Sequence, residues 1–187
     1  MKVMRKVNLA VCALALSVAS ATAFAATDGT VTFNGKLINE TCEVTPASKD
    51  VQVTLPTLST QNLKTAGQEA GSTSFVIDVI NCPTEITKVA AHFEAINSTG
   101  ANPVTGNLTN NSTTATPAGK VEVRLYDIAD NAQIRVGDTG SKFDVIPGTG
   151  ADPKGTVSLS YAGGYYATAA TTPGDVTAQV QYVLAYN

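Results

Sequence analysis

The sequence predicts an all-β fold, a single sandwich built from short strands. Apolar residues recur at every second position in several segments, and residues that favour turns, namely Gly, Pro, Asn and Thr, separate these segments. Because side chains alternate between the two faces of a strand, such a stripe marks one face for burial. Strands of this length and spacing are typical of a β-sandwich. The interior stripes are Val51 to Leu55, Ser74 to Ile80, Val121 to Leu125, Ile134 and Val136, Phe143 and Val145, and Val157 to Tyr165.

The two ends of the chain are built alike, as strands with one apolar face. Near the start, residues 29–37 place Val31, Phe33 and Leu37 on one side. At the end, residues 176–186 repeat the pattern, and their shared face carries Val176, Val180, Tyr182, Leu184 and Tyr186. Each stripe must be covered by another part of this chain or by another molecule. Pairing of both ends within their own sheet is the simpler interpretation of periodicity alone.

Two segments allow more than one interpretation, and a third is expected to be a loop. Residues 84–95 have helical spacing with Thr84 as a possible cap, but Val89 and Phe93 fit the alternation of a strand equally well. Residues 58–70 have room for a helical turn. The polar stretch 97–119 has no charged residue before Gly119 and is expected to be a long surface connection.

The first 25 residues are expected to be an export signal. Lys2, Arg5 and Lys6 precede an apolar run that ends in the small-x-small cleavage pattern at 23–25. A membrane anchor is the alternative, but polar residues interrupt the run at Asn8, Ser17, Ser20 and Thr22.

Removal of this signal leaves 187 − 25 = 162 residues, enough for one domain with one core. It also removes three of the 12 Lys and Arg residues and none of the 15 acidic ones, so the net charge becomes 9 − 15 = −6. A mildly acidic chain without Trp lacks the basic surface that binding to nucleic acid requires. Anionic membranes are equally unsuitable partners.

Cys42 and Cys82 remain after cleavage, whereas Cys12 leaves with the signal. Two cysteines in an exported domain most simply form one disulfide, and closing this loop contributes about 4 kcal/mol in the chain-entropy model. Two free buried thiols are the alternative.

No catalytic constellation is found in the sequence. His92 is the only histidine and is expected to be structural or exposed. Common hydrolase motifs are absent, and one histidine with two paired cysteines supplies too few ligands for zinc. No cofactor is expected.

Carboxylates offer two weaker possibilities. Asp127, Asp130 and Asp138 lie close in sequence, but their spacing differs from that of a calcium loop, so turn acids are the plainer interpretation. A pair of carboxylates for sugar hydrolysis depends on spatial separation, which leaves that alternative open at this stage. Five Asn residues match the N-glycosylation pattern, as expected in a chain rich in Asn and Thr: Asn39, Asn97, Asn107, Asn110 and Asn111.

Taken together and in order, several motifs resemble the major-subunit pilins of the bacterial chaperone-usher pathway, above all the type 1 fimbrial subunits. They are the segment Gly29 to Leu37 before the first cysteine, the interval between Cys42 and Cys82, the pattern Phe75-x-Ile77-x-Val79-x-x-Cys82, the element Tyr165-Tyr166-Ala167-Thr168, and the alternating C-terminus with Gly174 and Tyr186. The resemblance covers the whole mature chain.

The resemblance implies an incomplete immunoglobulin-like sandwich that lacks its last strand. In such pilins a strand of a periplasmic chaperone first fills the resulting groove. The N-terminal extension of the next subunit then replaces the chaperone strand, which is a known case of β-augmentation. The donor positions implied here are Gly29, Val31, Phe33, Gly35 and Leu37, with Gly35 allowing close approach of the backbone. The groove edge that the chaperone contacts is implied at Val180, Tyr182, Leu184 and Tyr186.

The organisation implied is a signal peptide at 1–25, a donor extension at 26–39 and a pilin domain at 40–187. The implied partners are identical or related subunits, the chaperone, an outer-membrane usher and a tip adhesin, and the implied location is a fimbrium on the cell surface. This chain departs from its relatives in two places. Its extension before Gly29 is short, which bears on the depth of insertion, and Gly163-Gly164 replaces larger residues.

Three functions compete at this stage. A structural, polymerising subunit is the function that the resemblance implies. A carbohydrate-binding adhesin or a minor adaptor subunit of the same pathway is the second, although tip adhesins usually add a receptor-binding domain. A secreted hydrolase is the third, and no motif supports it.

Overall fold

The structure is a computed structural model, and it describes residues 29–38, 41–96, 100–150 and 153–186. The chain divides into two units, Met1–Leu37 and Ile38–Asn187, and the sandwich belongs to the second. The expected signal at 1–25 lies outside the described residues. Within the described part, no helix has the length and apolar character needed to cross a membrane.

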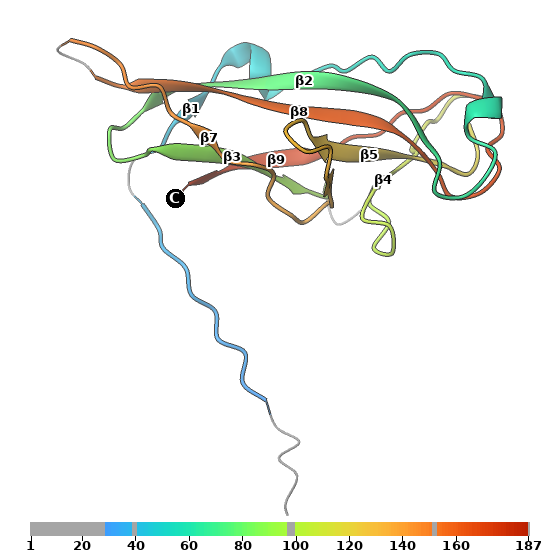
Figure 1. The fold of residues 1–187 in the computed structure, drawn as a ribbon, viewed down its shortest axis with the longest axis horizontal. Coiled ribbons are helices and arrows are strands. Elements are labelled where there is room, and N and C mark those ends of the chain that lie inside the picture. Colours follow the sequence, from blue (N-terminus) through green and yellow to red (C-terminus); the bar gives the residue numbers. More distant parts are fainter. Residues whose placement is uncertain (1–28, 39–40, 97–99, 151–152, 187) are drawn as a thin grey trace, which may run out of the picture. The chain divides into compact units, whose positions relative to one another are not determined.

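The sandwich consists of two antiparallel sheets that face each other in two layers (Figure 1). The larger has the order β1-β2-β8-β5-β4, with β6 also paired to β5. Its strands are β1 (Glu43–Val44), β2 (Glu69–Cys82), β4 (Leu108–Thr109), β5 (Val121–Asp127), β6 (Gln133–Ile134) and β8 (Gly155–Ala167).

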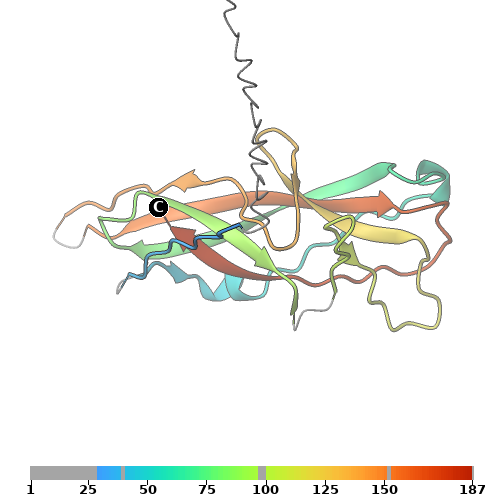
Figure 2. The same cartoon turned by 90° about the horizontal axis from the view of Figure 1, so that it is seen from below.

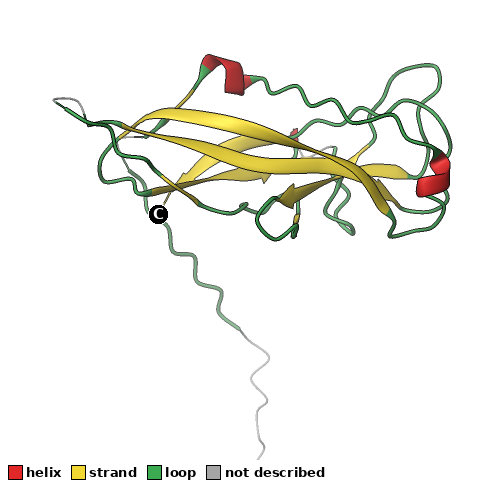
Figure 3. Ribbon diagram, turned by 45° about the horizontal axis from the view of Figure 1, so that its top comes forward, coloured by secondary structure: helices red, strands yellow, loops and turns green. Residues whose placement is uncertain are grey.

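The smaller sheet has the order β7-β3-β9, seen from below in Figure 2. Its strands are β3 (Lys88–Glu94), β7 (Phe143–Asp144) and β9 (Gln181–Tyr186). Two short 3₁₀ turns, η1 (Pro46–Lys49) and η2 (Thr60–Asn62), are coloured red in Figure 3. The expected all-β sandwich is therefore confirmed.

The core lies between the two sheets and follows the alternation read from the sequence. The inward residues of β8, Val157, Leu159 and Tyr161, are buried, and Ile77 and Val79 lie beside them on the paired strand β2. The rings of Phe93 and Tyr161 stand edge to face across the two sheets, with centroids 5.2 Å apart. This geometry is one that aromatic pairs prefer.

Within residues 84–95, the structure has the strand β3 (Lys88–Glu94) in place of a helix. β3 pairs with β9 on one side and β7 on the other, and the face that carries Val89, Ala91 and Phe93 is buried. Hydrogen bonds to two neighbouring strands decide the conformation, because propensity and spacing left both possibilities open. The helical turn expected within 58–70 is confirmed as η2.

The strand assignments expected from alternation, and the connection expected from composition, differ from the structure in four segments. Residues 51–55 and 176–180 are not assigned to any strand, and neither are the described residues 29–38. The stretch 97–119 is more than a surface connection, because it contributes β4 and buries Gly106, Asn107 and Leu108.

Candidate functional site

A long cavity of about 940 Å³ opens between two extended segments of the sandwich, residues 49–55 and 176–182. We call it the groove. Its floor consists mainly of apolar side chains from both sheets. They are Phe75, Ile77, Phe93, Leu108, Val123, Leu125 and Tyr165, together with the backbone of Gly163.

The C-terminal edge of the groove keeps the alternation expected from the sequence. Val176, Ala178, Val180 and Tyr182 are half-buried and pack against the core, whereas the residues between them are exposed. The opposite edge repeats this pattern more weakly, with Val51 and Leu55 half-buried. Among the described residues neither 51–55 nor 176–180 is assigned to a strand. The two edges therefore leave room for one more strand between them.

One end of the groove lies beside the disulfide. The hydroxyl of Tyr182 donates a hydrogen bond to the carbonyl of Ser48 at 2.5 Å, and the hydroxyl of Tyr186 bonds with Thr41 and with the backbone of Cys42. Burial raises the pKa of Tyr182, and it also raises the pKa of Tyr186 in spite of these hydrogen bonds, which lower it. We call this the disulfide end.

The other end, which we call the Tyr165 end, adjoins a second cavity of about 580 Å³. Tyr165 and Val176 line both cavities, and the second is also lined by residues 57–60 and 171–175, Leu63, Ala118 and Val121. Segment 49–55 therefore runs from the disulfide end toward the Tyr165 end, and segment 176–182 runs in the opposite direction.

The disulfide joins Cys42 to Cys82 with the two Cα atoms 4.1 Å apart. Both residues are buried, and β1 pairs with the last residues of β2 beside them, Glu43 opposite Ile80. The expected disulfide is confirmed. It fixes the first strand to the strand that supplies Phe75 and Ile77 to the floor.

The N-terminal segment exposes the side chains that the sequence places on its apolar face. Val31, Phe33 and Leu37 are 77%, 91% and 100% exposed. A Cβ atom added at Gly29 or Gly35 would meet no atom within 4 Å. Three large apolar side chains on one face, all in water, are typical of a segment that binds elsewhere.

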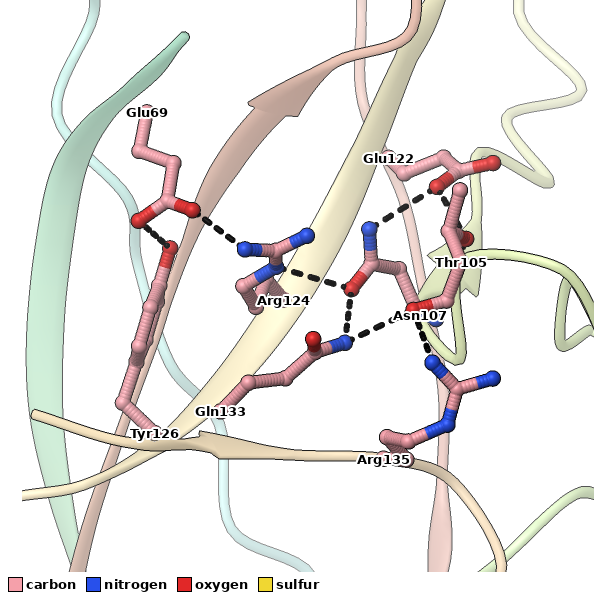
Figure 4. A network of polar contacts seen from close by, with 8 residues as sticks. All are labelled: Glu69, Thr105, Asn107, Glu122, Arg124, Tyr126, Gln133 and Arg135. Atoms are coloured by element: carbon pink, nitrogen blue, oxygen red, sulfur yellow. Dashed lines mark hydrogen bonds and ion pairs between the residues drawn. The ribbon is translucent and has the colours of Figure 1, made fainter. Parts of the chain in front are cut away.

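A network of polar side chains on the outer face of β5 supports the groove from behind (Figure 4). The buried amide of Asn107 donates to the Glu122 carboxylate at 2.9 Å and accepts from Arg124 at 3.1 Å. Arg124 also forms an ion pair with Glu69. The next residue along the chain, Leu108, belongs to the groove floor. The sequence analysis did not identify this network, because its members are far apart in the chain.

The residues considered for catalysis or metal binding do not gather into a site. His92 bonds to Thr139 at 2.8 Å and lies 3.8 Å from Glu94. Asp127 accepts from the backbone of Ser141, and Asp130 accepts from that of Ala132. No group of three or more potential metal ligands occurs among the residues that the structure describes.

Comparisons with known proteins agree on one family. The family model described as "Fimbrial protein" matches residues 31–187. The chain is 38% identical to the F17 fimbrial protein of Escherichia coli over 173 residues, which cover 91% of this chain and 94% of that protein. It is 40% identical to the major fimbrial subunit SMF-1 of Stenotrophomonas maltophilia over 171 residues, which cover 87% and 94%.

The fold also matches a solved structure. The P pilus rod subunit PapA superposes with a TM-score of 0.55 at 18% identity, over 79% of this chain and 100% of that one. The match supports the immunoglobulin-like pilin fold that the sequence resemblance implied. The chain therefore belongs to the fimbrial protein family and is a structural, non-enzymatic pilin subunit of a surface fimbria, exported through the periplasm.

Proposed function

We propose that the subunit polymerises by donor-strand exchange, with residues 29–37 of one copy occupying the groove of the next. The observation that carries this proposal is the match between the groove and the exposed segment. The groove has an apolar floor and two edges without a strand between them. The segment has an apolar face with the period of a strand and large side chains exposed on it.

The two partners also match in length. Four inward positions line the C-terminal edge from Val176 to Tyr182, and the four alternate positions from Val31 to Leu37 span the same number of residues. An inserted strand gains main-chain hydrogen bonds along both edges while its alternate side chains fill the groove. Burial of Val31, Phe33 and Leu37 contributes about 1.5 to 3 kcal/mol each, roughly 5 to 9 kcal/mol before the entropy of ordering is subtracted.

The direction of insertion follows from head-to-tail assembly. The chain enters the sandwich unit at Ile38, four residues before Cys42, which lies at the disulfide end. An open polymer requires contacts between different ends of successive subunits, so the disulfide end of one subunit meets the Tyr165 end of the next. Leu37 then lies at the Tyr165 end of the acceptor, and Gly29 reaches its disulfide end. The donor runs antiparallel to residues 176–182.

A periplasmic chaperone is the proposed occupant of the groove before assembly. β9 is an edge strand of its sheet, and Val180, Tyr182, Leu184 and Tyr186 are only half-buried. A bare apolar edge of this kind promotes aggregation, so the newly exported subunit needs a temporary partner. An outer-membrane usher and a tip adhesin complete the proposed set of partners.

The proposed organisation is a signal peptide at 1–25, a donor extension at 26–39 and a pilin domain at 40–187. It is supported by the compact unit that begins at Ile38. The extension is thus the part of the mature chain that precedes the first cysteine, and it serves the neighbouring subunit.

Deletion of residues 26–37 from the full chain tests the proposal. We expect exported, oxidised subunits that remain monomeric, because the groove is intact and the donor is missing. A second variant, Thr32→Phe with Phe33→Thr, keeps the length and composition of the donor but moves the phenyl ring to the other face of the strand. We expect it to assemble poorly as well, because the ring no longer points into the groove. Detergent-stable multimers formed by the deletion variant would overturn the proposal.

A further inference from the structure

We propose that Gly163 is a specificity position for assembly, because it leaves in the groove floor the space that receives Phe33 of the next subunit. This inference rests on the donor-strand exchange proposed above and specifies its register. Phe33 lies opposite Ala178 on the neighbouring edge. The pair Phe33 and Gly163 therefore decides which strand fits the groove and where that strand stops.

The floor of the groove lacks one side chain at its centre. On the inner face of β8, Leu159 and Tyr161 are fully buried and Tyr165 is half-buried, but position 163 between the tyrosines contributes no side chain. Its neighbours on the adjoining strands are Thr73 and Leu125. Gly163 is itself buried, and it is one of the residues that line the groove.

Packing of the subunit itself does not require a glycine at this position. A Cβ atom on Gly163 would lie 3.7 Å from its nearest neighbour, the Val123 side chain, which is ordinary van der Waals contact. On the adjacent Gly164, by contrast, a Cβ atom would lie 3.0 Å from the Ser72 backbone. Gly164 is thus explained by the close approach of β2, whereas Gly163 is explained only by something that enters the groove.

The C-terminal edge is also smallest at this level. Phe93 pairs with Tyr182, and its ring meets that of Tyr161 edge to face, which brings positions 161 and 182 to one level. Tyr165 and Val176 together line the second cavity. Gly163 therefore faces residues 178–180, and Gly163 and Ala178 are the two smallest residues that line the groove.

The donor segment has the complementary distribution of sizes. Phe33 is its largest side chain and has Gly35 two residues later. With Phe33 opposite Ala178 and the donor antiparallel to this edge, Gly35 lies beside Tyr165 and Val176, and Val31 lies beside Val180. A large residue thus meets a small one at the levels of Phe33 and Gly35, and two valines meet at the level of Val31. If the donor shifted by two residues, so that Gly35 lay opposite Ala178, then Gly35 would face Gly163 and Val31 would lie against Tyr182.

Enlargement of position 163 in the full chain tests this register. Gly163→Leu fills the space, and we expect the yield of detergent-stable multimers to fall at least tenfold. The double variant Gly163→Leu/Phe33→Ala is expected to form at least a third as many detergent-stable multimers as the single variant Phe33→Ala. Adding Val31→Ala, the matched control at the neighbouring pocket, is expected to restore none. Wild-type assembly by Gly163→Leu, or rescue by Val31→Ala in place of Phe33→Ala, would overturn the inference.

A second measurement does not depend on folding of the leucine variant. A chain with Phe33→Cys and Ala178→Cys should form a disulfide between subunits in the assembled rod, whereas Phe33→Cys with Val180→Cys should form at least fivefold less. The opposite ratio would exclude the register but leave donor-strand exchange intact. Rods that survive deletion of 26–37 would refute donor-strand exchange itself, so the two failures are distinguishable.

Discussion

The hydroxyl of Tyr182 on the last strand donates a hydrogen bond to the carbonyl of Ser48, 134 residues earlier in the chain. This contact crosses from one edge of the groove to the other and closes its disulfide end. Ser48 is itself buried, and its hydroxyl accepts a hydrogen bond from the backbone of Asp78 in β2. The two groove edges are therefore fixed relative to each other at this end before any strand is inserted.

Replacement of Tyr182 by Phe removes this cross-groove hydrogen bond and keeps the ring. We expect the free energy of unfolding to fall by about 0.5 to 1.5 kcal/mol, the usual net contribution of one such bond. Urea unfolding followed by circular dichroism measures the change. Tyr165→Phe, at the other end of the groove, is the control and should have a smaller effect. An unchanged midpoint for Tyr182→Phe would show that the contact contributes nothing to stability.

Loss of the disulfide is expected to lower the yield of folded subunit. The double variant Cys42→Ser/Cys82→Ser loses the constraint on a loop of 40 residues, which contributes about 4 kcal/mol in the chain-entropy model. The fraction of subunit that resists protease in periplasmic extracts measures the effect. The single variant Cys12→Ser, in the expected signal, controls for a general effect of removing a cysteine. A normal yield from the double variant would contradict this expectation.

Stability should fall in alkaline solution because of Tyr161. Burial raises the pKa of its hydroxyl to about 12, whereas the unfolded side chain titrates near 10. Below pH 10 both states keep the proton and stability is constant. Between pH 10 and 12 only the unfolded state loses it, so the free energy of unfolding falls by about 1.4 kcal/mol per pH unit.

Urea unfolding at several pH values measures this slope, and Tyr161→Phe should reduce it by about one proton. Burial and the Glu69 carboxylate also raise the pKa of Tyr126, so Tyr126→Phe is a useful comparison that leaves the Tyr161 contribution in place. An identical slope in the wild type and in Tyr161→Phe would contradict the assignment.

Replacement of Asn107 by Ala is expected to destabilise the fold more than the replacement of an exposed polar residue. Asn107 is 1% exposed, and its loss leaves Glu122, Arg124 and Gln133 each without one partner. Glu122 is the buried group among the three, and an unsatisfied buried group costs about 1 to 3 kcal/mol, so a loss of about 1 to 3 kcal/mol is expected in thermal or urea unfolding. Asn111→Ala, at an exposed position, is the control. Equal effects of the two substitutions would show that the network is not structural.

The sequence predicted strand faces better than strand boundaries. Val123 and Leu125 are buried as expected, because the period of side chains is a local property of the backbone. The residues 51–55 and 176–180 are not assigned to any strand, although the carbonyl of Thr177 accepts a hydrogen bond from the backbone of Asn111. A strand exists as a paired element only when a neighbour supplies hydrogen bonds, and no local pattern reveals the neighbour.

By itself the sequence determined the sandwich class, the apolar faces at both ends, the pairing of the two mature cysteines as the simplest outcome, and the family. Each depends on residue type and near-neighbour spacing. Only the tertiary structure decided that residues 49–55 form the second edge of the groove, that Asn107 is buried in a network, and that Gly163 lines the groove floor. These relationships join residues tens of positions apart, and they are fixed by sheet order and register, which alternation alone does not specify.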